Sequence, residues 1–248
     1  MNPEIDISNV ILKTERLLIR PWRQSDLDDF YSYASVDGVG QMAGWKPHES
    51  KEESKIILDM FISHKKTFAL EYQGKVIGSV GIEKYNETHF PEFKNKKCRE
   101  IGYVLSKEYW GQGLMPEALK EVIRFLFENA NLDVIFCGHF LWNEQSHRVQ
   151  EKSGFKHYAF DTYETAFGTT EENEVNILKP LANGFTTEDV AATSFGNPYE
   201  YAMVDEIDYP GFGYDCTADL DAFRTFTGWR NYTLQGECND GNAWMANG

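Results

Sequence analysis

A glycine turn between a predicted strand and a predicted helix is the part of this sequence best suited to chemistry. The turn contains Gly111 and Gly113, and residues 100–106 before it are apolar and rich in β-formers. After the turn, apolar side chains recur at the spacing of one helix face, at Leu119, Val122, Ile123, Leu126 and Phe127. Glycine lets backbone N–H groups approach a ligand, and Pro116 suits the first helical position. Gly-x-Gly pairs are also common in ordinary turns, but this unit predicts an anion site at a helix N-terminus.

A second predicted unit follows this helix. Residues 134–140 have the composition of a strand, and Asn143 can cap a short helix that Gly154 ends. A further strand is expected from Phe155 onward. The two units together place two helix N-termini after two neighbouring strands.

Three motifs in these units resemble those of the GNAT acyltransferases. They are Glu-Ile-Gly-Tyr at 100–103, Trp-Gly-Gln-Gly-Leu-Met-Pro-Glu-Ala at 110–118 and Asn-x-x-Ser-x-x-Val-x-Glu-Lys-x-Gly-Phe at 143–155. Within that superfamily the chain is most similar to the RimJ/RimL-type N-acetyltransferases, which modify ribosomal protein N-termini. Trp110 and Met115 depart from the residues that the wider superfamily prefers, yet both are frequent in the RimJ/RimL branch. The resemblance covers about residues 9–180.

The resemblance implies an α/β (α+β) fold with a mixed, mostly antiparallel sheet, splayed central strands and flanking helices. It also implies that acetyl-CoA is the cosubstrate, that no metal is required, and that acetyl passes directly to an amine in a ternary complex. The expected acetyl-CoA contacts are Tyr103, Val104 and Leu105 in the strand, Trp110, Gly111, Gln112, Gly113, Leu114 and Met115 in the turn, and Asn143. For Asn143, a plain helix cap is the alternative.

The candidate catalytic residues are Glu100, which begins the central strand at the expected acceptor end, and Ser146, which matches a serine that RimJ/RimL-type enzymes place near the sulfur. Glu100 is the candidate general base, with a solvated strand-end carboxylate as the alternative. Ser146 is the candidate proton donor to the leaving thiolate, with a hydrogen bond inside its own helix as the alternative. Met42 and Trp45 are expected to form an apolar wall of the acceptor site, unless Trp45 only packs its loop.

The acceptor implied by the same resemblance is the α-amino group of a protein. A polyamine, aminoglycoside or amino acid is the main alternative within the enzyme class. The other class is a binding protein that keeps the GNAT scaffold and engages a partner through its C-terminal region.

Composition limits the partners further. The net charge of −15 disfavours binding to nucleic acid through phosphate contacts. No apolar run approaches a membrane span and no signal peptide is recognisable, which predicts a cytoplasmic protein. The four cysteines are too scattered for a disulfide framework, although a Cys216–Cys238 bridge stays open, and no histidine lies at metal-ligand spacing with a carboxylate.

The rest of the chain divides at about residue 180. Before it we expect a first strand within 9–22, helices opened by capping boxes at Ser25 and Ser50, a hairpin of 67–72 with 75–85, and a strand pair of 155–163 with 174–180. We expect the helix faces to be Leu27, Phe30, Tyr31 and Ala34 in the first helix and Ile57, Met60 and Phe61 in the second.

Residues 181–248 resemble no family. They contain no lysine, two arginines, eleven acidic residues and many aromatics. That composition is unlike a disordered tail and predicts a small, loop-rich β module. The module either packs on the enzyme as a structural extension or binds a protein partner, for example as a negatively charged mimic of nucleic acid; a fused or frame-altered segment without a role is the remaining alternative.

Overall fold

The computed structural model describes residues 1–180, 234–237 and 243–246. The described residues fall into two compact units, one within Met1–Ala202 and one within Met203–Gly248. The first unit contains every residue to which a chemical role is assigned above.

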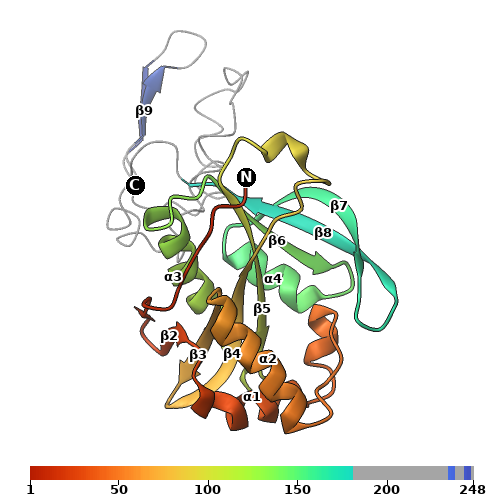
Figure 1. Cartoon of the computed structure of the whole chain (residues 1–248). Coiled ribbons are helices and arrows are strands. Elements are labelled where there is room, and N and C mark those ends of the chain that lie inside the picture. The colour runs from red at the N-terminus through yellow and green to blue at the C-terminus, as the bar shows by residue number, and fades with distance from the viewer. Residues whose placement is uncertain (181–233, 238–242, 247–248) are drawn as a thin grey trace. The chain divides into compact units, whose positions relative to one another are not determined.

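The first unit is built around one eight-stranded sheet, whose strands lie in the order β1-β2-β3-β4-β5-β6-β8-β7 (Figure 1). Its strands are β1 (Leu12–Lys13), β2 (Leu17–Pro21), β3 (Thr67–Tyr72), β4 (Lys75–Glu83), β5 (Cys98–Leu105), β6 (Val134–Phe140), β7 (Lys156–Glu164) and β8 (Thr170–Leu178). All neighbouring pairs are antiparallel except β5 and β6, which are parallel. The mixed, mostly antiparallel sheet confirms the predicted fold class.

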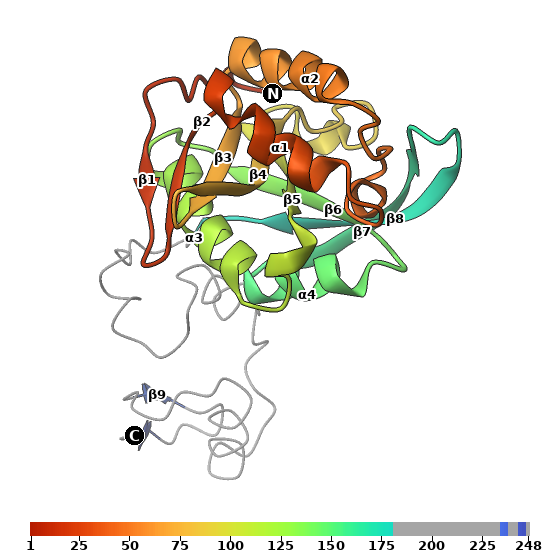
Figure 2. The ribbon, with the colours of Figure 1, turned by 90° about the horizontal axis from the view of Figure 1, so that it is seen from below.

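Four α-helices cover the two faces of this sheet (Figure 2). Helices α1 (Leu27–Ala34) and α2 (Lys51–His64) lie on one face, and α3 (Leu114–Glu128) and α4 (Glu144–Lys152) lie on the other. Short 3-10 turns, Gln24–Asp26, Gly40–Ala43, Pro91–Phe93 and Lys107–Tyr109, occur in the connections. The apolar face predicted for α3 is fully formed, because all five of its marker residues are buried.

The central parallel pair separates along its length. Strands β5 and β6 pair only between residues 98–100 and 134–136, although both strands continue beyond these pairs. The remaining residues of β5 stay paired to β4 on the other side. This is the splayed arrangement that the resemblance implies.

The first strand and the first helix differ from their predictions. Residues 9–22 form two strands, because the Thr14 hydroxyl accepts from Leu17 N at 2.9 Å and closes a turn between them. Ser25 caps nothing; instead the Asp26 carboxylate accepts from Arg23 N at 2.8 Å and pairs with buried Arg20. In α1 it is Tyr33, and not Tyr31, that is buried with Phe30 and Ala34.

The second helix begins as predicted, since Ser50 accepts from Glu53 N at 3.1 Å. Its buried apolar residue is Leu58, whereas the predicted Met60 is 42 % exposed. The hairpin of β3 with β4 and the pairing of β7 with β8 are confirmed, but β8 starts at Thr170. Pro116 is the third residue of α3 and not the first.

The second unit contributes one described antiparallel pair, β9 (Leu234–Glu237) with β10 (Ala243–Ala246). The other expectations for 181–248, including a Cys216–Cys238 bridge, fall outside the described residues. Cys98 and Cys137 are buried free thiols. In the described part of the chain, no helix has the length and hydrophobicity to span a membrane.

Candidate active site

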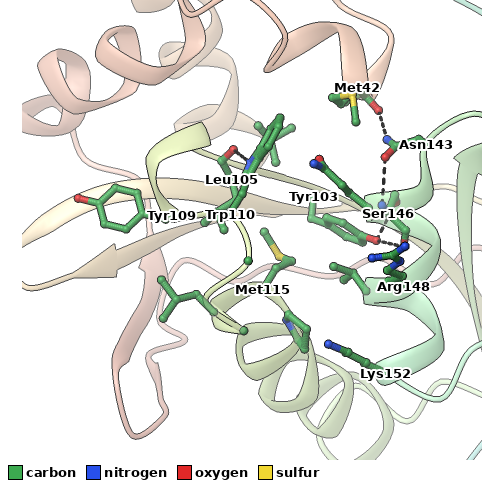
Figure 3. A pocket seen from close by; sticks show the side chains of 18 of the residues that line it. Met42, Tyr103, Leu105, Tyr109, Trp110, Met115, Asn143, Ser146, Arg148 and Lys152 are labelled. Carbon is green, nitrogen blue, oxygen red and sulfur yellow. Dashed lines mark hydrogen bonds between the residues drawn. The ribbon is translucent and has the colours of Figure 1, made fainter.

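A cavity of about 480 Å³ lies between β5 and the N-terminal ends of α3 and α4 (Figure 3). Most of the residues expected to contact acetyl-CoA line it: Tyr103, Val104, Leu105, Trp110, Gly111, Gly113, Leu114, Met115 and Asn143. Ser146 and Met42 line it as well. Glu100, Gln112 and Trp45 do not.

The α3 end of the cavity is built from backbone. Gly111 and Gly113 have φ values of 75° and 74°, a left-handed conformation that favours glycine. Gly113 is the N-cap residue and no side chain caps the helix, so the first N–H groups of α3 lack a side-chain partner. A Cβ on Gly111 would meet nothing within 4 Å, which leaves room for a ligand beside these groups.

Gln112 lies in the turn but does not line the cavity. Its side-chain amide donates to Glu108 O at 3.0 Å, and its backbone carbonyl accepts from the Arg16 guanidinium at 2.9 Å. Trp110 holds the other side of the turn, because its indole N–H donates to Leu105 O at 2.8 Å. These contacts fix the turn without using the N–H groups at the start of α3.

The α4 end of the cavity is built from side chains. Asn143 accepts from Ser146 N at 3.0 Å, which confirms it as a helix cap. The same amide donates to Met42 O at 3.0 Å and so ties α4 to the loop before α2. Because its own cap fills this helix end, α4 presents side chains to the cavity.

Ser146 and Tyr103 meet in the cavity, although 43 residues separate them. Their hydroxyl oxygens are 2.8 Å apart, and the Tyr103 hydroxyl is also 3.2 Å from Ser146 O. Burial raises the pKa of Tyr103, so its hydroxyl keeps its proton at neutral pH. Either hydroxyl can therefore act as a donor.

Two cations on α4, Arg148 and Lys152, also line the cavity, and sequence reasoning missed them. Their spacing of four residues puts them on one side of the helix, which is the signal that could have found them. With the amides of α3 they form a site for an anion.

The gap between β5 and β6 offers unpaired backbone groups. Ser106 N donates to Ile77 O at 2.7 Å, and bonding to the partner alternates along an antiparallel pair. Tyr103 and Leu105 therefore direct their backbone N–H groups toward the gap. Such a group can bind the carbonyl oxygen of an acyl group placed there.

Glu100 is the last residue of β5 that pairs with β6. Strand alternation puts its side chain on the face of Val104, which packs against the α1 and α2 cluster, whereas Tyr103 and Leu105 pack on the α3 side. Burial, reinforced by Glu83 and Asp161, raises the pKa of Glu100 from 4.5 to about 7. Among the described residues, no hydrogen bond or ion pair is made by the Glu100 side chain, so its carboxylate oxygens have no protein partner.

Of the two residues expected to form the acceptor wall, Met42 and Trp45, one lines the cavity and the other does not. Met42 reaches the cavity, but Trp45 packs beneath its loop, with its ring centroid 5.2 Å from that of His48. A Cβ on Gly40 would clash with the Trp45 ring, so the loop and this ring are closely packed. The position of Trp45 matches the alternative in which it packs the loop.

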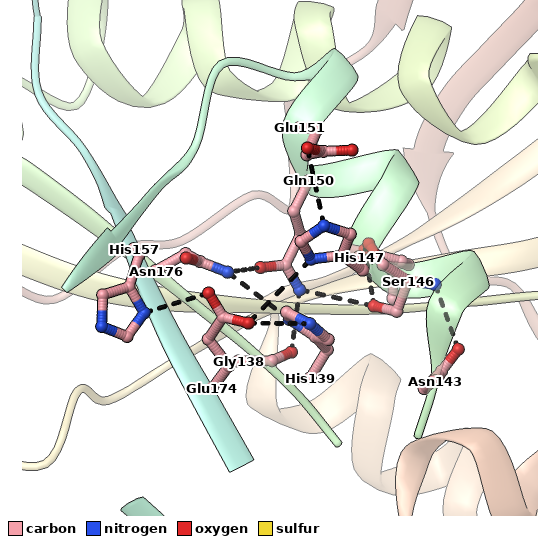
Figure 4. Close-up of polar contacts among 11 residues, drawn as sticks. Gly138, His139, Asn143, Ser146, His147, Gln150, Glu151, His157, Glu174 and Asn176 are labelled. Carbon is pink, nitrogen blue, oxygen red and sulfur yellow. Dashed lines mark hydrogen bonds and ion pairs between the residues drawn. The ribbon is translucent and has the colours of Figure 1, made fainter. Parts of the chain in front are cut away.

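Outside the cavity, His139, His147 and Glu174 bring their ligand atoms within 4.8 Å of one another. His157 joins them at 3.0 Å from Glu174 (Figure 4). Sequence spacing could not show the cluster, because its members come from β6, α4, β7 and β8.

Comparison with known proteins agrees with this geometry. Residues 16–156, more than half of the chain, match the acetyltransferase (GNAT) domain family. An uncharacterized N-acetyltransferase of Bacillus subtilis, YoaA, is 29 % identical over 186 residues, which are 68 % of this chain and 97 % of that protein.

Solved structures share the fold. The ribosomal-protein-S5-alanine acetyltransferase of Vibrio fischeri superposes with a TM-score of 0.55 at 23 % identity, over 69 % of this chain and 97 % of that one. RimJ of Mycobacterium smegmatis, in complex with CoA-disulfide, superposes with a TM-score of 0.56 at 16 % identity, over 83 % and 97 % of the two chains. The cavity, the splayed strands and the family match lead to one conclusion: this chain belongs to the GNAT family of N-acetyltransferases.

Proposed function

We propose that this protein transfers the acetyl group of acetyl-CoA directly to the N-terminal α-amino group of a protein. The observation that carries the acceptor class is the position of Glu100, whose carboxylate has no hydrogen-bond or ion-pair partner among the described residues and lies where β5 leaves β6, on the face opposite α3 and α4; burial and the neighbouring acids raise its pKa to about 7. An unperturbed α-amino group has a pKa of about 7.7–8.0, whereas a lysine side chain lies near 10.4. A base of this strength is well matched to the first and weak for the second.

Acetyl-CoA would enter from the side of α3 and α4. Its diphosphate would bind the N–H groups that follow Gly111 and Gly113, with Arg148 and Lys152 supplying positive charge. Its pantetheine would lie in the gap between β5 and β6 near Asn143, and the thioester would approach Tyr103 and Leu105.

The transfer would proceed in one complex. The amine nitrogen bonds to the acetyl carbon and loses a proton to Glu100, directly or through water. A backbone N–H from Leu105 or Tyr103 stabilises the oxyanion, and the C–S bond then breaks with its electron pair on sulfur. Ser146 donates a hydrogen bond to that thiolate. Proximity of the two bound reactants supplies much of the rate.

Similarity of fold to ribosomal-protein acetyltransferases supports the same acceptor class. Residues 181–248 carry none of the proposed site residues, so the proposed reaction requires nothing from them.

A panel of acceptors tests the proposal. Release of CoA thiol would be measured with peptides whose α-amino group is free, with the same peptides N-terminally blocked but containing lysine, with polyamines and with aminoglycosides. We expect turnover with the free α-amino peptides and none with the blocked ones. Turnover with polyamines or aminoglycosides alone would contradict the acceptor class, and acetyl-CoA binding without turnover on any amine would favour a binding protein.

A further inference from the structure

A buried side-chain amide, Gln150, lies one helical turn behind Ser146 (Figure 4). Gln150 is 1 % exposed, and its amide nitrogen lies 3.0 Å from Gly138 O and 3.3 Å from Ser146 Oγ. Its amide oxygen accepts from Asn176 at 2.8 Å. The side chain thus touches the proposed proton donor and fills no part of the cavity wall.

One backbone carbonyl fixes the direction of these hydrogen bonds. Because Gly138 O can only accept, the atom of Gln150 beside it must be the NH₂ group. The oxygen of Gln150 then faces Asn176, which must present its own NH₂ group. That group also lies 3.4 Å from Nδ1 of His139.

The hydrogen bond that Asn176 donates also sets the tautomer of His139. Its Nδ1 must accept, so its Nε2 carries the proton and points to Glu174, 3.4 Å away. Burial lowers the pKa of His139, which keeps the ring neutral as this pattern requires. The Nε2 lone pair is then not free for a cation, which argues against a metal at the histidine cluster.

On the cavity side, Gln150 limits where the Ser146 proton can go. A hydroxyl donates one hydrogen bond and accepts up to two. Ser146 Oγ accepts from Gln150, so its proton goes either to the Tyr103 oxygen or into the cavity. The Tyr103 proton can go to Ser146 O or to Ser146 Oγ; when it goes to Oγ, both acceptor positions of the serine hydroxyl are filled and the Ser146 proton points into the cavity.

We propose that Gln150 is a positioning residue that keeps Ser146 an acceptor on its buried side, so that the Ser146 proton is available to the departing thiolate. The inference rests on the proposed role of Ser146. It predicts that reversing the polarity of residue 150 is as harmful as deleting the Ser146 hydroxyl.

Gln150→Glu makes that reversal. An ionised carboxylate cannot donate to Ser146 Oγ and instead accepts its proton, which turns the hydroxyl away from the cavity. We expect kcat to fall at least tenfold, as in Ser146→Ala, with the Kd of acetyl-CoA within twofold of wild type. Since a protonated carboxyl can donate again, the ratio of wild-type to variant kcat should narrow as the pH is lowered. Gln150→Met, which keeps the length and removes the donor, serves if the acidic variant fails to fold.

A double-mutant cycle separates positioning from general damage. In the Ser146→Ala background, Gln150→Met should change kcat by less than twofold, because no hydroxyl remains to be oriented. Ser153→Ala is the control, since it removes another buried hydrogen bond of α4, 2.8 Å to Val149 O, and should leave kcat unchanged.

The outcomes that overturn the inference are distinct. If Ser146→Ala lowers kcat but both Gln150 variants match wild type, Gln150 has no positioning role and the proposed function stands. If the Gln150 variants lower kcat equally with and without the Ser146 hydroxyl, the role of Gln150 is structural. If Ser146→Ala itself leaves kcat unchanged, the donor role fails and the inference fails with it.

Discussion

The two faces of β5 differ in charge and in the groups they offer. The face toward α3 and α4 has free backbone N–H groups, the hydroxyls of Tyr103 and Ser146, and two cations. The opposite face has Glu100, with its pKa raised by burial and by the neighbouring acids. The first face suits a polyanion and the second suits an amine.

In the proposed function this difference lets one strand bring two substrates together. A large anionic donor and a cationic acceptor would approach from opposite sides of the sheet and meet where β5 leaves β6. Neither then has to displace the other. The variants below alter one face at a time, from the largest expected effect to the smallest.

Glu100→Gln removes the proposed base from the face proposed for the acceptor. We expect kcat/KM at pH 8 to fall about a hundredfold, within the range for general base catalysis. Wild-type kcat/KM should rise with pH through about 7 as Glu100 loses its proton, and the variant should lack that dependence. Glu83→Gln is the matched control: it removes a neighbouring charge, so the rise should move to lower pH and persist. An unchanged pH profile in Glu100→Gln would exclude Glu100 as the base.

Glu100→Gln should lower activity but raise the stability of the folded protein. Folding raises the pKa of Glu100, so the folded state binds the proton more tightly than the unfolded chain, and stability is lost as pH rises toward 7. Glu100→Gln removes this loss. We expect a higher Tm than wild type at pH 8 and a smaller difference at pH 5, measured by calorimetry.

Gly113→Val alters the acetyl-CoA face through the backbone. A β-branched side chain at φ 74° strains the turn and crowds the first N–H groups of α3. We expect acetyl-CoA to bind at least tenfold more weakly, about 1.4 kcal/mol, by calorimetric titration. Gly74→Val, at φ 80° in the open β3–β4 turn, imposes similar strain away from the cavity and should leave the affinity unchanged. Unchanged affinity in folded Gly113→Val would rule out the α3 site.

Arg148→Gln with Lys152→Gln removes the cations of that face. Since both side chains are exposed, we expect acetyl-CoA to bind only about fivefold more weakly, with a larger difference in affinity at low salt. Acetyl-pantetheine, which lacks the diphosphate, should bind the variant and the wild type equally. Lys156→Gln, an exposed lysine outside the cavity, is the control. An equal loss for both ligands would show that the two cations do not bind phosphate.

Asn143→Asp separates the two bonds of the α4 cap. The carboxylate keeps the acceptor for Ser146 N and loses the donor to Met42 O, whereas Asn143→Ala loses both. Loss of a cap costs about 1 kcal/mol, so Tm should fall more in Asn143→Ala than in Asn143→Asp. Equal Tm values in the two variants would mean that the cap contributes little.

Truncation after Pro180 should have the smallest effect, because all proposed site residues precede it. We expect a soluble protein with acetyl-CoA affinity and kcat within twofold of the full chain. A truncated protein that is insoluble, or that binds acetyl-CoA without transferring it, would make residues 181–248 part of the catalytic body.

The sequence predicted those parts of the site that depend on local conformation. Gly111 and Gly113 were identifiable because the turn requires a left-handed backbone, and Asn143 because a helix cap has a restricted composition. The strands β3, β4 and β6 followed from composition and turn residues in the same way.

The parts that depend on tertiary packing were not predictable. Arg148 and Lys152 could be assigned to the cavity only once the orientation of α4 was known, and Gln150 only once Gly138 O was found beside it. Burial of Tyr33 in place of Tyr31 depends on how α1 rotates after Asp26 joins Arg20. Periodicity alone does not fix such rotations.

A crystal structure of the protein with bound CoA would test most directly whether the two faces of β5 serve the two substrates. We predict diphosphate oxygens at the N–H groups of residues 111–115, pantetheine in the gap between β5 and β6, and the CoA sulfur within hydrogen-bond distance of Ser146 Oγ. CoA bound on the Glu100 face, or bound with its sulfur beyond the reach of Ser146, would contradict the account.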